Sequence, residues 1–486
     1  MEALEDAIVR DLWIDGAPAL ADGGARSEVS EPATGGNLAD VARAGPADVA
    51  RAVDAADRAF RQGPWPRASA AGRAAVLLRL AAGIRAELES LAVIEARNAG
   101  KPIVDARWEV GAAASCFEIF AGAARQLSGR VAPEDAPGLA LVLRQPVGVC
   151  ALIVPWNFPF LIAAWKVAPA LAAGNCAVLK PASATPLTAL QLGRLARDAG
   201  LPPGVLNVLP GPGASVGTEL IANPAVRKIS FTGDSENGAG ILRAAAADIK
   251  RVSLELGGKS ANIVFADADL DACVSSSLLA VFGNAGQDCC ARSRVLVEES
   301  IHDDFVERFT AATRALRVGD PLDPETQVGS LISPTHRESV REYVSIGEGE
   351  GARRVCGGDP LDRPGAFLAP AVFDRVETGM RIAQEEIFGP VVAVLPFRDE
   401  EQAVALANDT PYGLSGSLWT RDGARALRVA RAVETGVLSV NSNRSVHVEA
   451  PFGGWKRSGL GRELGPEALE SYTEVKTVYL ESEDSQ

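Results

Sequence analysis

Features typical of membrane, secreted and nucleic-acid-binding proteins are missing from this sequence of 486 residues. It has no uninterrupted apolar run of the roughly 18 residues that a membrane-spanning helix needs, so we expect no membrane partner. The N-terminus lacks the apolar core of a signal peptide. Acidic residues outnumber basic ones, 62 to 48, and the net charge of −14 argues against a nucleic-acid surface.

Histidine is scarce, and the cysteines follow no ordered pattern. The chain has three histidines and seven scattered cysteines, with no HxH, HExxH or CxxC motif, so we expect no bound metal. An odd number of irregularly spaced cysteines does not indicate a disulfide framework. Reduced thiols and a cytoplasmic location are therefore expected.

What the sequence does contain is typical of a globular α/β protein. Apolar residues make up 47% of it, and 48 glycines and 30 prolines are spread along its length. A chain of this length predicts two or three domains. Amphipathic or alanine- and leucine-rich patterns predict helices over 47–62, 69–99 and 107–127.

Short apolar runs alternate with helix-like segments in the middle of the chain, which predicts parallel sheets covered on both faces. The expected strands of a first set are Val147–Val154, Cys176–Leu179, Val205–Leu209, Ile229–Phe231 and Val252–Leu256. The expected strands of a second set are Ala261–Phe265, Arg294–Val297, Val391–Pro396 and Gly436–Val440, with helices over Leu270–Phe282 and 303–317. Ligands of such sheets bind where the strands end.

The tail Tyr472–Leu480 is predicted to be an extended strand with exposed apolar residues. An unpaired strand of this kind promotes aggregation. We therefore expect it to pair with the sheet of another subunit.

Two glycine-containing segments lie between a predicted strand and a predicted helix, at Gly211–Gly217 and Thr232–Gly238. Glycines there permit a tight turn and close approach of a pyrophosphate. The first segment reads GxGxxxG, which departs from the usual dinucleotide fingerprint. Each segment could equally be a plain turn or a helix N-cap, and only their occurrence in one sheet favours a nucleotide site.

The segment Gly286–Arg294 has the sequence pattern that most strongly indicates a catalytic residue. Cys289 follows a glycine turn and precedes Arg292 and Arg294, and this setting favours an exposed thiol with a lowered pKa. Cys290 is a strong rival, since most cysteines are small buried hydrophobic residues.

Glu255 alternates with Leu254 and Leu256 and is followed by two glycines. It could be a solvated carboxylate on a strand, but the glycines favour a crowded site. Trp156 and Trp165 could be ordinary core aromatics. His447 has no acidic or amide partner nearby in sequence and is expected to be an ordinary loop residue.

Seven ordered motifs resemble those of the aldehyde dehydrogenase superfamily, from about residue 10 to residue 480. They are Pro155–Pro159, Lys180–Ser183, Phe231–Gly233, Glu255–Ser260, Gly286–Cys289, Glu385–Pro390 and Pro451–Gly454. The resemblance implies an α/β fold with a Rossmann-like cofactor domain of parallel strands, an α/β catalytic domain and a small β oligomerisation segment. It places the cofactor domain at 1–123 and 147–256, the catalytic domain at 257–457 and the bridging segment at 124–146 and 458–486.

The resemblance implies oxidation of an aldehyde to a carboxylic acid. Cys289 would attack the aldehyde carbon, and the amide of Asn157 with the backbone N–H of Cys289 would hold the oxyanion. Hydride transfer would leave a thioester, which water activated by Glu255 would hydrolyse. Lys166 matches a lysine that supports this site.

The implied cofactor is NAD or NADP. Lys180 would bond the adenine ribose, Glu386 would hold the nicotinamide ribose, and Phe388 would flank the ring. The full implied set is Ile153, Pro155, Trp156, Asn157, Lys180, Ser183, Gly213, Gly217, Phe231, Thr232, Gly233, Asp234, Leu256, Gly257, Glu386 and Phe388.

Two members of this set depart from the family pattern. Ser183 stands where NAD-specific relatives often have glutamate, so a 2′-phosphate is not repelled. Asp234 stands where Ser or Thr is usual; its carboxylate would disfavour a pyrophosphate unless it faces the helix N-terminus.

Nine residues match positions of the family's substrate tunnel: Trp108, Ala112, Phe158, Ile162, Trp165, Gly283, Asp288, Arg444 and Val446. Small residues at Ala112 and Gly283 indicate room in the same tunnel. Asp288 and the aromatic walls favour an amino-aldehyde or a broad substrate range. Arg444 favours instead an aldehyde that carries a carboxylate.

Two other functions are compatible with the fold. A CoA-acylating semialdehyde dehydrogenase would lack the water-activating glutamate, whereas Glu255 is present. A binding or structural protein would tolerate loss of the nucleophile, whereas Cys289 and Asn157 remain. We expect a homodimer or homotetramer that acts on a small-molecule aldehyde.

Overall fold

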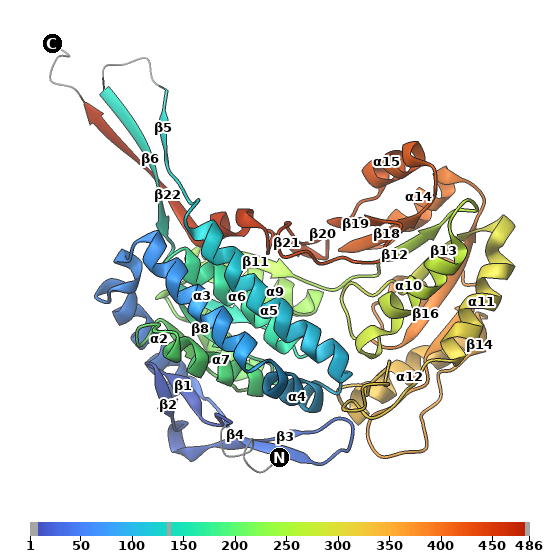
Figure 1. Cartoon of the computed structure of the whole chain (residues 1–486), viewed down its shortest axis with the longest axis horizontal. Coiled ribbons are helices and arrows are strands. Elements are labelled where there is room, and N and C mark those ends of the chain that lie inside the picture. The colour runs from blue at the N-terminus through green and yellow to red at the C-terminus, as the bar shows by residue number, and fades with distance from the viewer. Residues whose placement is uncertain (1–7, 134–137, 482–486) are drawn as a thin grey trace.

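The computed structural model describes residues 8–133 and 138–481, which form two lobes and a projecting arm (Figure 1). The N-terminal lobe holds an eight-stranded sheet of order β2-β1-β9-β8-β7-β10-β11-β21. Its five central strands, β9, β8, β7, β10 and β11, run parallel. Its strands are β1 (Leu12–Ile14), β2 (Ala17–Ala19), β7 (Val149–Ile153), β8 (Cys176–Lys180), β9 (Leu206–Val208), β10 (Val226–Thr232), β11 (Arg251–Glu255) and β21 (Gly459–Leu460).

All five strands predicted for the first sheet are therefore present and parallel. Helices pack around this sheet, and those of the N-terminal lobe are α2 (Pro46–Arg61), α3 (Ala70–Ala86), α4 (Leu88–Ala99), α5 (Ile103–Ala124), α6 (Pro159–Ala172), α7 (Leu187–Asp198), α8 (Thr218–Ala222) and α9 (Ser235–Ala245). The segment 69–99, predicted to be helical, forms the two helices α3 and α4. They are separated at Glu87, whose backbone (φ −105°, ψ 18°) leaves the helical region.

The second lobe is built on a seven-stranded sheet of order β14-β15-β16-β13-β12-β18-β19, parallel except at its β14 edge. Its strands are β12 (Ala261–Val264), β13 (Arg294–Glu298), β14 (Arg353–Cys356), β15 (Ala371–Asp374), β16 (Val391–Phe397), β18 (Ser415–Trp419) and β19 (Val437–Val440). Its helices are α10 (Leu270–Phe282), α11 (His302–Arg314), α12 (Pro334–Gly349), α13 (Arg381–Gln384), α14 (Glu400–Asn408) and α15 (Gly423–Ala432).

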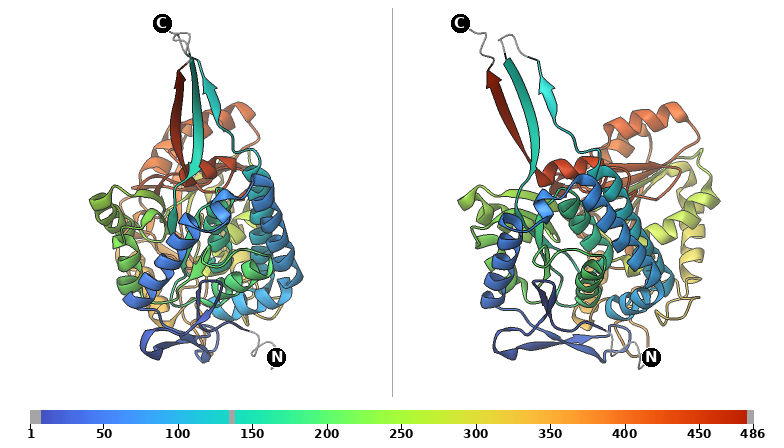
Figure 2. Two further views of the ribbon diagram at one scale, coloured as in Figure 1. Left: turned by 90° about the vertical axis from the view of Figure 1, so that its left-hand side faces the viewer. Right: turned by 60° about the vertical axis from the view of Figure 1, so that its left-hand side comes forward.

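A three-stranded antiparallel sheet extends away from both lobes as an arm (Figure 2). It consists of β5 (Arg130–Ala132), β6 (Gly138–Pro146) and β22 (Thr473–Glu481). The predicted tail strand is present as β22, but it pairs along its whole length with β6 of the same chain. The sequence did not identify β6 as its partner. Because β22 is an edge strand of this sheet, its pairing with the sheet of another subunit stays a prediction.

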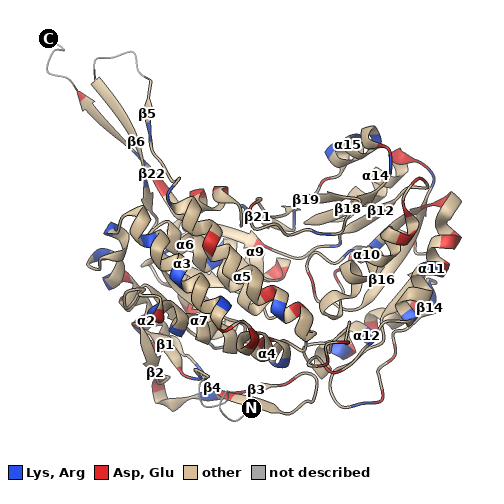
Figure 3. Cartoon of the chain, in the orientation of Figure 1, with Lys and Arg blue, Asp and Glu red and all other residues tan. Residues whose placement is uncertain are grey.

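Two small pairings complete the described structure. One joins β3 (Arg26–Ser30) to β4 (Asn37–Ala42), and the other joins β17 (Tyr412–Gly413) to β20 (Trp455–Lys456). Lys/Arg and Asp/Glu residues are interspersed over the helices of both lobes rather than separated by sign (Figure 3). Within the described ranges, no helix is both long and apolar enough to cross a bilayer.

Each lobe has its own apolar core. The strands β7, β8, β10 and β11 all end on one side of the first sheet, because parallel neighbours terminate together. The segment that follows α10 carries Cys289, which packs against the first core although α10 belongs to the second lobe. The boundary between the lobes therefore brings the strand ends and the cysteine together.

Candidate active site

Two cavities meet at Cys289. One, of about 760 Å³, is lined by residues of α5, α6 and α10 and by the segment 443–447. The other, of about 1170 Å³, runs past the ends of β7, β8, β10 and β11 to α8 and α9. Thr232, Leu256 and Cys289 line both. A group bound in one cavity can therefore react with a group bound in the other at this thiol.

The turn that carries the thiol has an unusual backbone. Asn284, Ala285 and Gly286 all have positive φ, at 50°, 55° and 70°. A Cβ placed on Gly286 would lie 2.3 Å from the carbonyl oxygen of Gly389, so only glycine fits this approach. The Gln287 amide group bonds to the Asn284 carbonyl at 3.0 Å and accepts from Ile332 N–H at 2.8 Å. These contacts fix the start of the Cys289 segment.

The thiol of Cys289 is held in its neutral form. A hydrogen bond with the Cys290 thiol, burial, and the negative neighbours Asp288 and Glu386 raise its pKa well above 9.0. The sequence-based expectation of a lowered pKa is wrong. Arg292 follows closely in sequence, but its buried guanidinium bonds Ser415, Ser417 and Ser445 instead of the nucleophile.

Cys290 differs from Cys289 in its access to the two cavities. It is 6% exposed and lines only the smaller one, whereas Cys289 lines both. The side-chain ligand atoms of Asp288, Cys289 and Cys290 lie within 4.8 Å of one another, a spacing that a metal ion could use. This cluster contains no HxH or CxxC motif, and the sequence patterns gave no sign of it.

Glu255 ends β11 inside the smaller cavity rather than on a solvated face. Its side chain is buried, and neither carboxylate oxygen has a hydrogen-bond partner. Burial and the nearby Glu463 raise the pKa of Glu255 well above 4.5, while Lys166 opposes that shift. A carboxyl group in this setting holds a proton more readily than an exposed one, as a group that exchanges protons in catalysis must.

Lys166 lies behind Glu255 rather than in either cavity lining. Its ammonium forms an ion pair with Glu463 and donates to the Ser230 hydroxyl at 3.0 Å. The Ser230 hydroxyl donates to the same Glu463 carboxylate at 2.7 Å. Lys166, Ser230 and Glu463 therefore form a buried polar group next to Glu255, and only Lys166 was anticipated from the sequence.

Asn157 lies on the opposite side of the thiol segment. Its Nδ2 donates to the Gln287 carbonyl at 3.0 Å, and its Oδ1 is buried without a partner. One amide proton of Nδ2 is thus used within the protein, and the second stays available to a bound group.

The larger cavity has the shape and the groups that a dinucleotide needs. Every residue of the implied cofactor set lines it except Ser183, whose hydroxyl instead donates to the Gly211 carbonyl at 2.9 Å. The buried Lys180 ammonium donates only to its neighbour Pro181, and burial lowers its pKa to about 8. The Thr232 hydroxyl is buried with no partner. These groups fit the hydroxyls of a ribose.

Close backbone approach occurs where a nicotinamide ribose would lie. A Cβ on Gly257 would lie 2.0 Å from the Glu386 carboxylate, so a larger residue would displace that side chain. Glu386 accepts from Gly258 N–H at 3.0 Å, and burial raises its pKa to about 7. The other carboxylate oxygen of Glu386 takes no part in this hydrogen bond with Gly258.

The unusual Asp234 is explained by the helix that follows it. Its Oδ1 accepts from the backbone N–H groups of Glu236 and Asn237 at 3.1 and 2.9 Å, as an N-cap of α9. Asn237 Nδ2 donates to the other oxygen at 2.6 Å. The expected alternative, that Asp234 faces the helix N-terminus, is therefore confirmed, and its charge is directed at the helix end.

One aromatic group of the larger cavity was missed. His336 lies 5.4 Å from the ring of Trp156, and its Nε2 lies 2.8 Å from the Phe388 carbonyl. Phe388 itself has φ of 56° and an edge contact with Trp156. Trp156 is thus part of the cavity wall. His336 lies on α12, far from the recognised motifs, so no local signal marked it.

Of the nine expected tunnel residues, seven line the smaller cavity: Trp108, Phe158, Ile162, Trp165, Asp288, Arg444 and Val446. The expected contributors Ala112 and Gly283 are not among its lining residues. Trp165 faces Phe452 at 5.2 Å in the interior, and Trp108 and Leu279 are 54% and 65% exposed at the mouth. His447, expected to be an ordinary loop residue, also lines the cavity. The lining residues not anticipated are Leu161, Ser276, Leu279, Ala280, Leu414, Asn443, Ser445 and Phe452.

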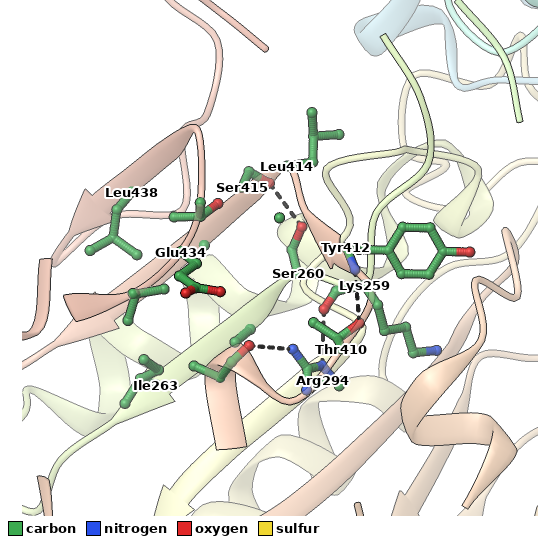
Figure 4. A pocket seen from close by; sticks show the side chains of 16 residues that line it. Lys259, Ser260, Ile263, Arg294, Thr410, Tyr412, Leu414, Ser415, Glu434 and Leu438 are labelled. Carbon is green, nitrogen blue, oxygen red and sulfur yellow. Dashed lines mark hydrogen bonds between the residues drawn. The ribbon is translucent and has the colours of Figure 1, made fainter. Parts of the chain in front are cut away.

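A third, much smaller pocket of about 10 Å³ lies between β12 and the segment 410–416 (Figure 4). Arg294 crosses it to donate to the carbonyls of Lys259 and Ala407 at 2.9 Å. The Lys259 ammonium is buried without a hydrogen-bond partner, and burial lowers its pKa to about 7. The pocket is large enough for about one water molecule and serves packing.

Comparison with known proteins supports the same interpretation. The model described as "Aldehyde dehydrogenase family" matches residues 20–478. Betaine aldehyde dehydrogenase of Bacillus subtilis is 43% identical over 473 residues, 96% of each chain. Retinaldehyde dehydrogenase 3 of Homo sapiens is 42% identical over 464 residues, 95% of this chain and 91% of the relative.

Solved structures are equally similar. An NAD-dependent aldehyde dehydrogenase from Sinorhizobium meliloti superposes with a TM-score of 0.96 at 42% identity, covering 97% of this chain and 95% of that chain. A betaine aldehyde dehydrogenase from Staphylococcus aureus in complex with NAD⁺ gives a TM-score of 0.98 at 35% identity, covering 100% and 97%.

The close approach at Gly286 makes a first prediction. Gly286→Ala should lower the melting temperature and abolish activity, because the new Cβ meets the Gly389 carbonyl and the residue must keep φ of 70°. Gly283→Ala is the matched control in the same turn, since a Cβ there meets nothing within 4 Å. Differential scanning fluorimetry and steady-state rates would test this. Equal effects of the two substitutions would contradict it.

The raised thiol pKa makes a second prediction. Because only the thiolate reacts, iodoacetamide should label Cys289 of the free enzyme about tenfold faster per pH unit up to and beyond pH 9. Asp288→Asn removes a negative neighbour, so it should lower the thiol pKa and speed labelling at pH 8. Peptide mapping by mass spectrometry separates Cys289 from the half-buried Cys356. A labelling rate that is flat above pH 7 would refute the assignment.

Proposed function

This chain belongs to the aldehyde dehydrogenase family and oxidises an aldehyde to its acid with NAD(P)⁺, and we propose that Cys289 is the nucleophile and Glu255 the base. The observation that supports this most is the position of Cys289 at the junction of the two cavities, with Glu255 lining the smaller one. The aldehyde would occupy the smaller cavity and the dinucleotide the larger.

The reaction begins with a neutral thiol. Glu255 in its ionised form takes the proton of Cys289, and the sulfur forms a bond to the aldehyde carbon. The carbonyl electron pair moves onto oxygen, where the second Nδ2 proton of Asn157 and the Cys289 N–H stabilise it. Burial of these donors strengthens their effect because water does not compete.

The bound dinucleotide supplies the hydride acceptor. When the hydride leaves the thiohemiacetal, the oxygen lone pair re-forms the carbonyl and a Cys289 thioester remains. Once Glu255 has released the thiol proton to solvent, it takes a proton from water, and the resulting hydroxide attacks the thioester carbon. The C–S bond then breaks, the acid leaves, and the Cys289 sulfur takes back a proton from Glu255. Lys166, held by Glu463 and Ser230, lowers the pKa of Glu255, whereas Glu463 raises it.

The cofactor would lie along the larger cavity with Lys180 at the adenine ribose and Glu386 at the nicotinamide ribose. Ser183 carries no charge and is bonded to Gly211, so nothing at this position repels a 2′-phosphate. Both NAD and NADP are therefore proposed as cofactors.

For the substrate we retain an amino-aldehyde or a broad range of aldehydes. Aromatic rings of Phe158 and Trp165 and the carboxylate of Asp288 surround the inner part of the cavity, which suits a cation or an apolar body. Asp288 accepts from Cys290 N–H at 2.8 Å, so part of its capacity is used locally. The exposed Arg444 lies in the same lining and favours a distal carboxylate on longer substrates.

Neither competing function gains support. A CoA-acylating enzyme would have no use for a buried acid in the substrate cavity, whereas Glu255 lies there. A non-catalytic protein would have no use for a thiol at the junction of two large cavities. Acyl-enzyme trapping with and without CoA distinguishes the first of these.

The arm supports an oligomer, a homodimer or a homotetramer. Its most exposed apolar residues are Val131, Val475, Tyr479 and Leu480, which are 61%, 57%, 53% and 50% exposed. An exposed apolar sheet of this kind marks an interaction surface. We also propose a division into three parts, with the arm in the bridging part. The cofactor domain comprises 1–123 and 147–256, the catalytic domain 257–457, and the bridging part 124–146 and 458–486. A cytoplasmic location remains a prediction from the reduced thiols.

The two catalytic roles make a third prediction. Cys289→Ser should abolish aldehyde-dependent NADH formation, and Cys290→Ser should retain it. Glu255→Gln should retain adduct formation at elevated pH but slow thioester hydrolysis by at least about 10²-fold, since it removes the general base. Rapid-quench mass spectrometry would detect the accumulated acyl-enzyme. Loss of activity only in Cys290→Ser would reject the nucleophile assignment.

The arm makes a fourth prediction. Val475→Glu with Tyr479→Glu should convert the oligomer to a monomer, because charge is placed on the apolar edge of β22. Leu78→Glu, at a residue 51% exposed on α3, is the control and should leave the mass unchanged. Light scattering after gel filtration measures the mass. An unchanged mass for the arm variant would exclude this surface.

A further inference from the structure

A charged group that the proposed reaction does not use is buried next to the Asn157 segment. It consists of Glu95 on α4, Glu109 on α5 and Lys101 in the link between these helices, with exposed fractions of 0%, 0% and 1%. Burying three ionisable side chains is costly unless each is paired or hydrogen-bonded. Most of their contacts lie at the start of α6, and Glu95 also accepts from the Thr188 hydroxyl on α7 at 2.7 Å.

The two carboxylates cap α6. The helix begins at Pro159, and its N-cap residue Phe158 makes no side-chain cap hydrogen bond. Instead, Glu95 accepts from the backbone N–H of Phe160 at 3.1 Å, and Glu109 accepts from that of Leu161 at 3.3 Å. These are free donors of the first helical turn, where negative charge is favourable.

The ammonium of Lys101 reaches the residue just before that turn. It forms an ion pair with Glu109 and donates to the main-chain carbonyl of Asn157 at 2.8 Å. It also lies 4.5 Å from the ring centre of Phe158. Asn284, from the thiol turn, donates to the same Asn157 carbonyl at 2.9 Å and to the Gln287 carbonyl at 3.2 Å.

Asn157 is thereby fixed at both its main chain and its side chain. Lys101 and Asn284 hold its carbonyl, while its Nδ2 donates to the Gln287 carbonyl, two residues before Cys289. We propose that Lys101, held by Glu109, is a positioning residue that sets the distance between the Asn157 amide and the Cys289 sulfur. This inference rests on the proposed role of Asn157 as the oxyanion donor.

Lys101 affects the position of the Asn157 amide rather than the charge at the reacting atoms. Lys101 itself lines neither cavity, so it acts through neighbours that do: Asn157, by a hydrogen bond, and Phe158, by its ring. Without the Lys101 ammonium, Glu109 either keeps a buried negative charge near Glu95 or takes up a proton. The Asn157 carbonyl loses one of its two hydrogen-bond donors. Burial and Glu95 already raise the pKa of Glu109 well above 4.5, and Lys101 opposes this. A displacement of about 1 Å at a donor can cost about 10²-fold in rate.

A double-mutant cycle in the full-length enzyme tests the proposal. Stopped-flow absorbance would follow the burst of NADH with saturating NAD⁺ and propionaldehyde, and fluorescence titration would give the Kd for NAD⁺. Lys101→Met should slow the burst about 10²-fold, and Asn157→Ala about 10²- to 10³-fold. The double variant should be no slower than Asn157→Ala alone, because the proposal has Lys101 act through Asn157 rather than through Phe158. The Kd for NAD⁺ should stay within about threefold throughout.

The matched control is Lys228→Met. Lys228 is also 1% exposed. Its ammonium donates to the Ser253 hydroxyl at 2.6 Å rather than to the Asn157 segment. Its burst should stay near that of the wild type. If Lys101→Met does not fold, Glu109→Gln replaces it in the cycle, since glutamine keeps an acceptor for Leu161 N–H and removes the charge that holds Lys101. Lys101→Arg should restore part of the rate.

The results of these experiments distinguish the positioning role of Lys101 from the donor role of Asn157. A wild-type burst in folded Lys101→Met with a slow burst in Asn157→Ala overturns the positioning role alone. Losses that multiply in the double variant also overturn it, because they assign Lys101 a general structural effect. A wild-type burst in Asn157→Ala rejects the proposed donor itself, and the positioning role falls with it.

Discussion

The backbone contact between Gly286 and Gly389 is the constraint on which the site depends. It joins the turn that precedes the thiol to the turn that carries Glu386 and Phe388, with no side chain between them. The positive φ values of residues 284–286 and of Phe388 are compatible with this contact and cost conformational energy. The two cavities can share Cys289 because these two turns lie in contact.

Electrostatics around this contact favour neutral groups. Burial and mutual repulsion raise the pKa values of Cys289, Glu255 and Glu386, while burial lowers those of Lys180 and Lys259. The strongest positive charge near the thiol, Arg292, is directed at serine hydroxyls and main-chain carbonyls of the second lobe. The thiol therefore needs a base to react, and the acid that shares its cavity is the one suited to that role.

The sequence predicted the parts of the fold that depend on local pattern. The parallel strands of the first sheet and the helices α2 and α10 follow from apolar periodicity and caps. It did not predict the break at Glu87, because both halves have the same composition, or the pairing of β22 with β6, which lie more than 300 residues apart. The sign of the Cys289 pKa shift depends on where Arg292 points, and sequence proximity gave the opposite answer.

The separate paths of the two cavities have a kinetic consequence. An aldehyde that approaches past Trp108 and Leu279 does not cross the space between α8 and α9 where the dinucleotide would lie. The oxidised product can leave by the first path while the reduced carrier still occupies the second. The geometry thus imposes no fixed order in which the acid and the reduced carrier leave.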